Sequence, residues 1–541
     1  MPIAGETPDP AFPIEWVDPS DATLTWEWDD MHMPRALAPL AGDWVRVLGA
    51  GMAYGYLRLG TPAEVRVRIW NGYAYFALAT DVPESEQPAM WAQRREGCRA
   101  RIPLTEAYWH DQVVPELREH YAWVAAQPVE AMSRDQLSQA WDEAWTRIGR
   151  CWSLHFYVIR GPYQVLDDLA DLYESIVENA PPGEALMLIG GAIDELHDVQ
   201  RQLDGLAALA AATPALAKAL AEPGASIADL AAVDGSGLFV ARLDAFLNEH
   251  GHLGQSFDDL TIASWAEEPG LLIGELAKRI ASPPAVSIEA RRERLAKDAD
   301  ALAARVRSTL ATDPEQLGRF EAVLAAARRV GPLTETHNYW IDRMAQASLR
   351  RFVMRVGRRL ADEGSIADPA DIFLFRRDEV PDVIRQPGDR RALLADRAAT
   401  LARQAATRPP RHVGLIPTEE GGGDRFDGVR FASTDPNQLQ GTGASPGIAR
   451  GPARVILTQA DFGSVQAGDI IVCPSSNPSW VPLFAIAGGL ITDTGGVISH
   501  AAVVAREFAL PAVVGTRDGT LRIADGRLVE LDGTTGSVRL L

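Results

Sequence analysis

Apolar and polar residues follow different periodicities along the chain. Over residues 64–78 they alternate with a period of two, and Asn71-Gly72 interrupts the alternation. Asn-Gly favours the positive φ angles of a type I′ turn, so we predict a β-hairpin within residues 60–80. From about Glu86 to Thr407 apolar residues recur every three or four positions, and Ala, Leu, Glu and Arg dominate. This pattern predicts a mainly helical domain over residues 1–407, with a small N-terminal hairpin region.

The pattern changes again towards the C-terminus. Residues 408–440 contain Pro409-Pro410, Gly421-Gly422-Gly423 and many polar residues, which predicts a flexible linker. Residues 441–541 form short apolar runs separated by glycines, as expected of a compact α/β domain. We predict strands at 453–457, 469–473, 489–492, 512–515 and 528–531, and a helix at about 499–509. The predicted fold class is therefore multidomain, α plus α/β.

Composition narrows the possible partners. The chain has 541 residues, of which 47% are apolar and 23% charged, an ordinary globular composition. Its net charge of −21 argues against nucleic acid and anionic membranes as partners, because both attract clustered Lys and Arg. The three cysteines form no CxxC pair and the N-terminus has no signal-peptide pattern. We therefore expect a cytoplasmic protein without a disulfide framework or a metal site of its own.

The most informative segment runs from Thr492 to Pro511. Gly495 and Gly496 allow a tight turn after a strand, and Ser499 is a favourable N-cap for the apolar helix that follows. His500 then lies in the first helical turn, where free N–H groups and the helix dipole stabilise an anion. Neutral imidazole is a nucleophile near pH 7, so these residues suit a transiently phosphorylated histidine. A capping or core histidine is the alternative.

The surrounding motifs favour the phosphorylated histidine. In order they are Gly447-Ile-Ala-x-Gly451-x-Ala453, Asp493-x-Gly-Gly-x-x-Ser-His500, Arg506-Glu507, Pro511-Ala-Val-Val-Gly515, Asp525-Gly526 and Asp532-Gly533-x-x-Gly536. The chain resembles the phosphoenolpyruvate-utilising enzymes over residues 441–541, which correspond to their swivelling phosphohistidine domain. The resemblance implies that His500 is the catalytic residue and that the domain swings between two active centres. It also implies a phosphohistidine loop made of Thr492, Gly495, Gly496, Ser499 and Arg506.

Two parts of the complete enzymes of this family have no counterpart in the sequence. The sequence lacks a glycine-rich phosphate loop, which an ATP-grasp domain would contain. It also shows no barrel domain for pyruvate before Leu541. The order of domains is most similar to the histidine-bearing subunit of phenylphosphate synthase, or to rifamycin phosphotransferase without its ATP-grasp domain. The resemblance then implies a separate ATP-grasp subunit as partner. ATP and Mg²⁺ are the implied cofactors, bound mainly by that subunit.

The helical domain resembles the same relatives through weaker motifs. They include Trp28-Asp-Asp-Met-His32-Met-Pro34, Phe246-Leu-x-Glu249-His250-Gly251-His252 and Glu335-x-His337-x-x-Trp340-Ile-Asp342-Arg343. Leu253 stands where relatives often have a basic residue, which weakens a phosphate-binding role for that loop. An acceptor site needs a base, cations and an apolar wall. The candidates for it are His337, Arg343, Arg350, His250, His252, His32 and Trp28.

The resemblance implies a dikinase-type phosphotransferase that is one subunit of a two-component enzyme. A phosphoryl group passes from ATP to His500 and then to the hydroxyl of a small organic acceptor, with a phenol-type aromatic as the first expectation. A rifamycin-like antibiotic is the second expectation. A phosphocarrier or regulatory protein with no acceptor chemistry of its own is an alternative of another class.

Overall fold

The computed structural model describes residues 12–30, 32–181, 183–192, 195–254, 259–281, 286–407, 409–415, 437–457, 459–476, 480–484, 486–497 and 499–541. The chain forms two compact units, each assembled from segments distant in sequence. Unit 1 contains Met1–Gly161, Ser256–Ala263 and His337–Glu420, and unit 2 contains Pro162–Gln255, Ser264–Thr336 and Gly421–Leu541. The helices expected to form one domain over residues 1–407 are thus divided between the two units.

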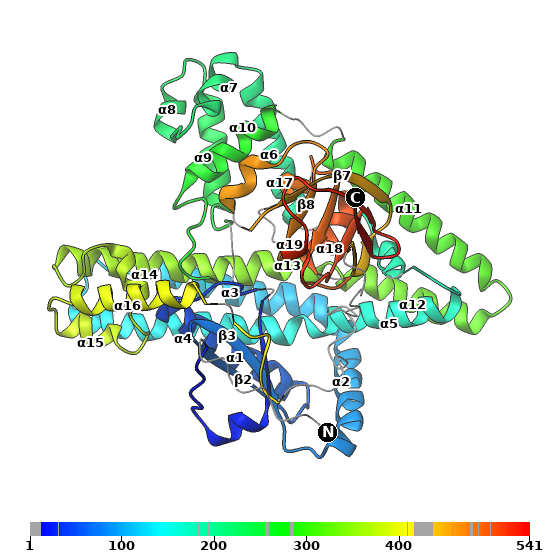
Figure 1. Ribbon diagram of the computed structural model, residues 1–541, viewed down its shortest axis with the longest axis horizontal. Helices are drawn as coiled ribbons and strands as arrows, with labels where there is room; N and C mark the ends of the chain where they lie inside the picture. Colours follow the sequence, from blue (N-terminus) through cyan, green and yellow to red (C-terminus); the bar gives the residue numbers. More distant parts are fainter. Residues whose placement is uncertain are drawn as a thin grey trace. The chain divides into compact units, whose positions relative to one another are not determined.

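Unit 1 combines a four-stranded antiparallel sheet with helices (Figure 1). The strand order is β2-β3-β1-β4. The strands are β1 (Thr25–Trp28), β2 (Glu64–Trp70), β3 (Tyr73–Ala79) and β4 (His412–Gly414). The helices are α1 (Pro39–Arg58), α2 (Gln87–Tyr108), α3 (Val114–Ala125), α4 (Arg134–Val158), α14 (Met344–Asp362), α15 (Val380–Arg385) and α16 (Arg391–Ala405), with π-helical turns η3 (Trp109–Val113) and η5 (Asn338–Arg343).

The predicted hairpin is confirmed as β2 and β3. Asn71 and Gly72 form its turn with φ angles of 48° and 82°, the left-handed conformation that a type I′ turn requires. β1 pairs with β3 on one side and with β4 on the other, where Trp26 is opposite Val413. β4 belongs to the stretch expected to be a linker, so that end of the stretch is an ordered strand.

Helices α1 and α4 pack at very short range because α1 presents glycines to α4. A Cβ at Gly51 would lie 2.7 Å from the main-chain carbon of Trp152, and one at Gly55 would lie 2.8 Å from the carbonyl oxygen of Phe156. No larger residue fits at these positions without moving a helix. This contact fixes the C-terminal half of α4, which carries His155.

Unit 2 contains a helical part and the C-terminal α/β domain. The helices of the first part are α5 (Arg160–Ile176), which starts at the end of unit 1, α6 (Glu195–Ala211), α7 (Pro214–Ala221), α8 (Ile227–Ala231), α9 (Gly237–His250), α10 (Pro269–Ala281), α11 (Ile288–Thr309), α12 (Pro314–Val330) and α13 (Leu333–His337). These helices, together with those of unit 1, confirm the predicted helical character of the region before residue 407.

The C-terminal domain is built on an eight-stranded mixed sheet, orange to red in Figure 1. The strand order is β5-β12-β11-β7-β8-β9-β10-β6, and β7 to β10 are parallel to one another. The strands are β5 (Gln438–Gln440), β6 (Thr442–Ser445), β7 (Ile448–Val455), β8 (Ile470–Cys473), β9 (Gly489–Thr492), β10 (Ala512–Val514), β11 (Leu528–Asp532) and β12 (Ser537–Leu540). The helices are α17 (Val481–Phe484), α18 (His500–Glu507) and α19 (Gly519–Arg522).

Both faces of this sheet are buried, as alternation along its strands requires. Ile471 and Leu490 belong to one apolar cluster together with Ala502 and Ala505 of α18. Ile470 belongs to the cluster on the opposite face. The architecture confirms the predicted fold class, a helical protein with a C-terminal α/β domain. Of the predicted linker, residue 408 and residues 416–436 lie outside the described residues, and its last residues form β5.

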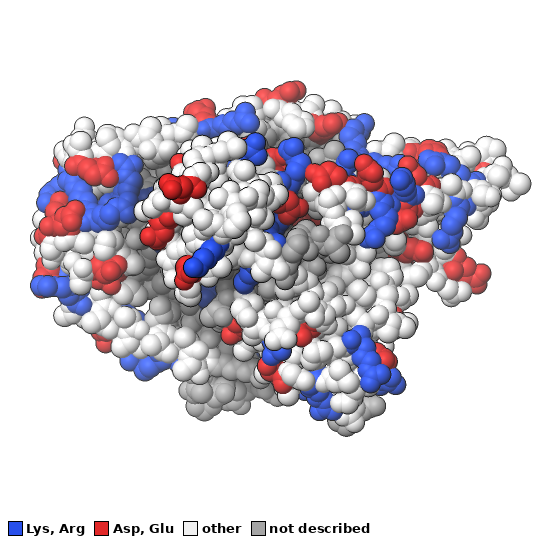
Figure 2. Space-filling view, turned by 90° about the horizontal axis from the view of Figure 1, so that it is seen from above, with Lys and Arg blue, Asp and Glu red and all other residues white. Residues whose placement is uncertain are grey.

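Three general properties of the described residues relate to the expectations drawn from composition. No single helix among them is long and apolar enough to cross a membrane; only the bent pair His197–Ala211 and Pro214–Ala221 reaches the required length and hydropathy when taken together. Figure 2 shows acidic and basic side chains interspersed over the face that it presents. Cys98, Cys151 and Cys473 are buried free thiols.

Candidate active site

The loop between β9 and α18 holds the residues predicted to form the phosphohistidine site. β9 ends at Thr492 and α18 begins at His500. Between them Gly495 has a φ angle of 101°, and a Cβ at this position would lie 2.8 Å from Oγ of Ser499. Both the backbone conformation and the lack of space require glycine here.

Ser499 starts the helix as its N-cap. Its backbone is extended and its hydroxyl accepts a hydrogen bond from the N–H of Ala502 at 3.4 Å, while its own N–H donates to the carbonyl of Gly496 at 3.0 Å. His500 is consequently the first residue of α18. The main-chain N–H groups of the first turn have no partners within the helix, and the positive end of the helix dipole lies there. An anion at this place would be stabilised.

Hydrogen bonds fix the strand end that precedes the loop. The hydroxyl of the buried Thr492 donates to the carbonyl of Thr494 at 2.6 Å. The carbonyl of Thr492 accepts hydrogen bonds from both the N–H and the hydroxyl of Thr516, each at 2.9 Å. Asp493 accepts a hydrogen bond from the N–H of Thr520 at 2.9 Å. The glycine turn therefore starts from a rigid base.

Arg506 lies in the last turn of α18, at the opposite end of the helix from the glycine turn. Its Nη1 donates to the carbonyl of Ala444 on β6 at 3.0 Å. Burial lowers the pKa of Arg506 to about 10, and the negative charges of Glu507 and Glu335 oppose that shift. The side chain stays charged at neutral pH, and its hydrogen bond joins α18 to the sheet.

A second group of titratable side chains lies inside unit 1. Nδ1 of His155 lies 2.6 Å from Oδ1 of Asp342, and Nε2 of His337 lies 4.0 Å from Oδ2 of the same carboxylate. The centroids of the two imidazole rings are 4.6 Å apart. All three side chains are buried, with 8% of His155 and 3% of each of the others exposed. One carboxylate is thus shared by two histidines.

Burial shifts the pKa values of this group in opposite directions. It raises the pKa of Asp342 to about 7, against the effect of the nearby His337. It lowers the pKa of His155 well below the ordinary value, and the positive charges of Arg160 and His32 lower it further. His155 is therefore neutral at physiological pH.

A π-helical turn brings His337 and Asp342 together. The turn η5 lies between α13 and α14, and its wider winding places residues five positions apart on one side of the helix. Arg343 is the last residue of this turn, is buried, and its charge acts on Asp342. The spacing of six residues between His337 and Arg343 predicts different faces of a regular helix.

Arg350 has a different environment from Arg343. Its Nη1 donates to the carbonyls of Leu260 and Thr261 at 3.1 and 2.8 Å, and its guanidinium lies 5.1 Å from the ring centroid of Phe373. These contacts hold the segment 259–263 against α14. They give Arg350 a structural role in unit 1.

Trp28 is the last residue of β1, and His32 lies in the segment that follows it. Nε1 of Trp28 donates to the carbonyl of Met33 at 3.2 Å, and its ring packs edge-on against Tyr73. His32 is 40% exposed and its Nδ1 lies 2.9 Å from Asp29. His32 lies near enough to affect the pKa of both His155 and Asp342. Of the acceptor candidates, His337 lies beside the Asp342 carboxylate and the charges of Arg343 and His32 act on it, whereas Trp28 packs against Tyr73.

His250 and His252 belong to unit 2, at the end of α9. Nε2 of the buried His250 lies 3.0 Å from Nε2 of Gln202, and burial lowers its pKa. Ligand atoms of His250, Asp198 and Glu249 lie within 4.8 Å of one another, a spacing that could hold a divalent cation. His252, which follows His250 by two residues, is also buried.

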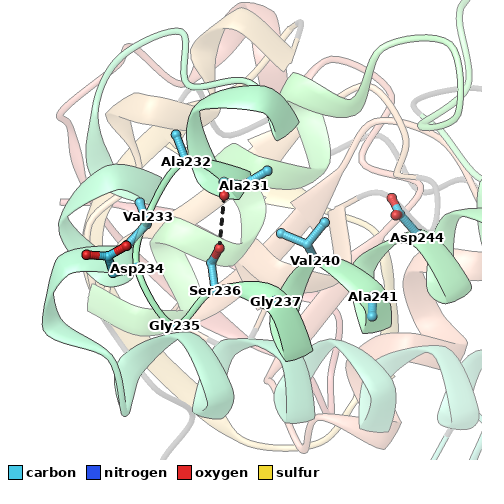
Figure 3. A pocket seen from close by; sticks show the side chains of 10 residues that line it. All are labelled: Ala231, Ala232, Val233, Asp234, Gly235, Ser236, Gly237, Val240, Ala241 and Asp244. Carbon is cyan, nitrogen blue, oxygen red and sulfur yellow. Dashed lines mark hydrogen bonds between the residues drawn. The ribbon is translucent and has the colours of Figure 1, made fainter.

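A surface depression lies at the junction of α8 and α9 (Figure 3). Its lining is formed mainly by small apolar residues, and the hydroxyl of Ser236 donates to the carbonyl of Ala231 within it. The two carboxylates in the lining belong to Asp234 and Asp244. The residues lining this depression include no histidine and no arginine, so it lacks the groups that an acceptor site requires.

His155 was not among the residues selected from the sequence, and Asp342 appeared there only within a motif. His155 lies on α4, 187 positions before Asp342, among buried aromatic residues. A histidine on an otherwise apolar helix face, as in Trp152-Ser-Leu-His155-Phe156, was the available signal.

Comparison with known proteins identifies the C-terminal domain. Residues 465–536 match the family described as PEP-utilising enzyme, mobile domain. This part of the chain is a PEP-utilising mobile domain. It contains the glycine turn, Ser499 and His500, so the resemblance inferred from the sequence is confirmed. Residues 170–335, in the helical part of unit 2, match the rifampicin phosphotransferase fourth domain.

Three relatives show how far the similarity extends beyond the mobile domain. A chondramide synthase of Chondromyces crocatus is 32% identical over 98% of this chain, which corresponds to 14% of the synthase. The uncharacterised phosphotransferase YvkC of Bacillus subtilis is 28% identical over 56% of this chain and 36% of its own. A rifampicin phosphotransferase of Streptomyces sviceus is 31% identical over 58% of this chain and 36% of its own. The chain thus spans about a third of the two phosphotransferases and a smaller share of the synthase.

Proposed function

We propose that this chain is a phosphotransferase in which His500 carries the phosphoryl group. The observation that supports this most strongly is the position of His500 as the first residue of α18, directly after the glycine turn and the Ser499 cap. A phosphoryl group on this histidine would have its negative charge beside the free N–H groups of the helix. The mobile-domain match and the phosphotransferase relatives point to the same chemistry.

ATP is the proposed donor, and an ATP-grasp protein is the proposed partner that binds ATP with Mg²⁺. An imidazole nitrogen of His500 attacks the β-phosphorus, a N–P bond forms, and the bond from the β-phosphorus to the oxygen of AMP breaks. Water then hydrolyses the bond between the β- and γ-phosphoryl groups, which releases inorganic phosphate and leaves the β-phosphoryl group on His500. Mg²⁺ neutralises charge on the phosphate oxygens in the partner. On this chain the helix N-terminus then stabilises the phosphohistidine.

The proposed acceptor is the hydroxyl of a small organic molecule. Its oxygen attacks phosphorus, the N–P bond breaks, an O–P bond forms, and a base takes the hydroxyl proton. A phenol-type aromatic is one acceptor class. A rifamycin-like antibiotic is the second, and the match to the rifampicin phosphotransferase fourth domain and the relatives of that name favour it.

A phosphocarrier without its own acceptor chemistry is the alternative of another class. It shares the phosphohistidine with the enzyme but needs no base in unit 1. The buried His155, Asp342 and His337 around a π-helical turn favour the enzyme, because such turns are frequent at functional sites.

An acceptor assay tests the proposed transfer. The chain is phosphorylated with ATP, Mg²⁺ and an ATP-grasp protein from the same source, separated from nucleotide, and mixed with phenol or rifampicin. We expect a phosphate monoester by mass spectrometry from wild type and from the control His120→Ala, whose imidazole lies on α3 beside Glu116. We expect none from His500→Ala. A phosphorylated wild-type protein that transfers to neither compound, nor to any member of a hydroxyl-compound library, would favour the phosphocarrier.

A further inference from the structure

The contact between His155 and Asp342 has the geometry of a histidine held in one tautomer. Oδ1 of Asp342 lies 2.6 Å from Nδ1 of His155, and when Asp342 is ionised its carboxylate accepts the Nδ1 proton. The second ring nitrogen, Nε2, is then the basic one. In catalytic triads an aspartate orients a histidine in this way so that Nε2 can remove a hydroxyl proton.

The elements around this histidine supply the other groups that an acceptor site needs. Trp152 and Phe156 of α4 flank the imidazole, with ring centroids 5.1 and 4.3 Å away. The guanidinium of Arg160 at the start of α5 lies 5.4 Å from the ring centroid of Tyr56 and acts electrostatically on His155. An apolar aromatic wall and a cation therefore accompany the imidazole.

The charged groups that face the pair come from several elements. His337 from α13 and Arg343 from η5 act on Asp342, and His32 from the segment after β1 acts on both members of the pair. Apart from Asp342, the groups named here are cationic or become so on protonation. Such surroundings favour anionic oxygens nearby.

We propose that His155 is the general base for the acceptor hydroxyl and that Asp342 is its positioning residue. This proposal rests on the proposed function. The acceptor oxygen attacks the phosphorus borne by His500, the N–P bond breaks with its electron pair returning to the His500 imidazole, and the hydroxyl proton moves to Nε2 of His155. The proton then leaves to solvent, and both histidines return to their starting states.

A purely structural role for the pair makes a different prediction. A structural His–Asp contact stabilises unit 1 but has no effect on chemistry once the protein is folded. A general base contributes a factor of about 10²–10⁴ to the rate. The two roles therefore differ in the transfer rate of a folded variant.

The first test measures phosphoryl transfer to phenol and to rifampicin from protein phosphorylated on His500. His155→Gln is compared with His120→Gln, a histidine of the same unit that contacts Glu116 and Arg147. We expect His155→Gln to be phosphorylated normally, to remain folded under the assay conditions and to transfer at least about 100-fold more slowly. Asp342→Asn should also lower kcat, with little change in KM. Transfer by His155→Gln within threefold of wild type would overturn the proposal.

The second test does not depend on knowing the acceptor, and it decides the matter if neither compound is phosphorylated. Diethylpyrocarbonate modifies neutral, accessible imidazole nitrogens, and mass spectrometry locates the modified residue. We expect modification of His155 at a rate that stays constant from pH 6 to pH 8, and absence of modification would overturn the proposal. Stoichiometric binding of Co²⁺ that is lost in Asp342→Asn would also overturn it, in favour of a metal site. Failure to phosphorylate His500 at all would instead contradict the proposed function, which this second test does not require.

Discussion

The guanidinium of Arg506 lies 3.0 Å from the carbonyl oxygen of Ala444 and so connects the helix of His500 to β6. Arg506→Lys removes this hydrogen bond and leaves a buried carbonyl unpaired, which should cost about 1–3 kcal/mol of mobile-domain stability. Phosphorylation of His500 should persist at temperatures where the domain is folded. The matched control is Arg522→Lys, whose partly exposed guanidinium donates to Gln438. Loss of phosphorylation in a fully folded Arg506→Lys protein would assign Arg506 a direct role at the phosphoryl group.

Gly495→Ala should abolish phosphorylation. Its Cβ would collide with Ser499, 2.8 Å away, in addition to the strain of a φ angle of 101°. Gly526→Ala has a similarly positive φ angle of 78° but nothing within 4 Å, so it carries the strain alone. We expect at least a tenfold loss of His500 labelling in Gly495→Ala and normal labelling in Gly526→Ala. Equal labelling of the two variants would show that the geometry of the turn is not required.

Two variants of Ser499 distinguish its role as the N-cap of α18 from the effect of a negative charge at the helix N-terminus. Ser499→Ala removes the cap of α18 and should cost about 0.5–2 kcal/mol of domain stability. Ser499→Asp keeps a capping oxygen but places a negative charge beside the phosphoryl group, so stability should be retained while phosphorylation of His500 falls. Thermal melting and labelling together distinguish the two effects. A Ser499→Asp protein labelled as well as wild type would argue against an anion at the helix N-terminus.

Gly55→Ala tests the close contact between α1 and α4. The added methyl would lie 2.8 Å from the carbonyl oxygen of Phe156, so the helices must separate and unit 1 should lose about 1–3 kcal/mol. Gly205→Ala, within α6, meets nothing within 4 Å and should gain about 0.5–1 kcal/mol from helix propensity. Because His155 lies on α4, Gly55→Ala should also slow transfer. Denaturant unfolding measures the first effect and the acceptor assay the second.

The His155–Asp342 pair predicts opposite pH dependences for two variants. In His155→Gln, Asp342 keeps a raised pKa, so stability falls as pH rises from its ordinary value of 3.8 to about 7. In Asp342→Asn, His155 keeps a lowered pKa, so stability falls as pH drops below its ordinary value of 6.5. In wild type the two shifts change stability with pH in opposite directions, so the two dependences oppose each other.

Melting temperatures measured from pH 5 to pH 8 check this account of the pair. Relative to wild type, the melting temperature of His155→Gln should fall towards pH 8, and that of Asp342→Asn should fall towards pH 5. Parallel curves for the two variants would show that burial does not shift these pKa values in opposite directions.

Local sequence patterns predicted most of the mobile domain. Apolar runs located β8, β9, β10 and β11, and Ser499 located the start of α18. Strands β5, β6 and β12 were not predicted, because polar residues, or glycine in Thr442–Ser445, interrupt their apolar positions and leave no apolar run. Their pairing depends on neighbouring strands that periodicity along the chain does not reveal.

The site in unit 1 was predicted only in part, since it depends on tertiary structure. His337 and Arg343 were selected through a motif, yet their partner His155 lies on another helix, 187 positions before Asp342. The π-helical turn that aligns His337 with Asp342 has no clear signal in sequence. Arg350 was selected with them, but its hydrogen bonds to Leu260 and Thr261 stabilise the fold.

The most direct test of the central claim is phosphorylation of His500 itself. The chain is incubated with Mg²⁺ and ATP labelled with ³²P at either the β or the γ position, alone and with an ATP-grasp protein from the same source. His500→Ala and the control His120→Ala are treated in parallel. The account predicts acid-labile, base-stable label from the β position that requires the ATP-grasp protein and His500 but not His120. Absence of label in wild type, or undiminished label in His500→Ala, would contradict it.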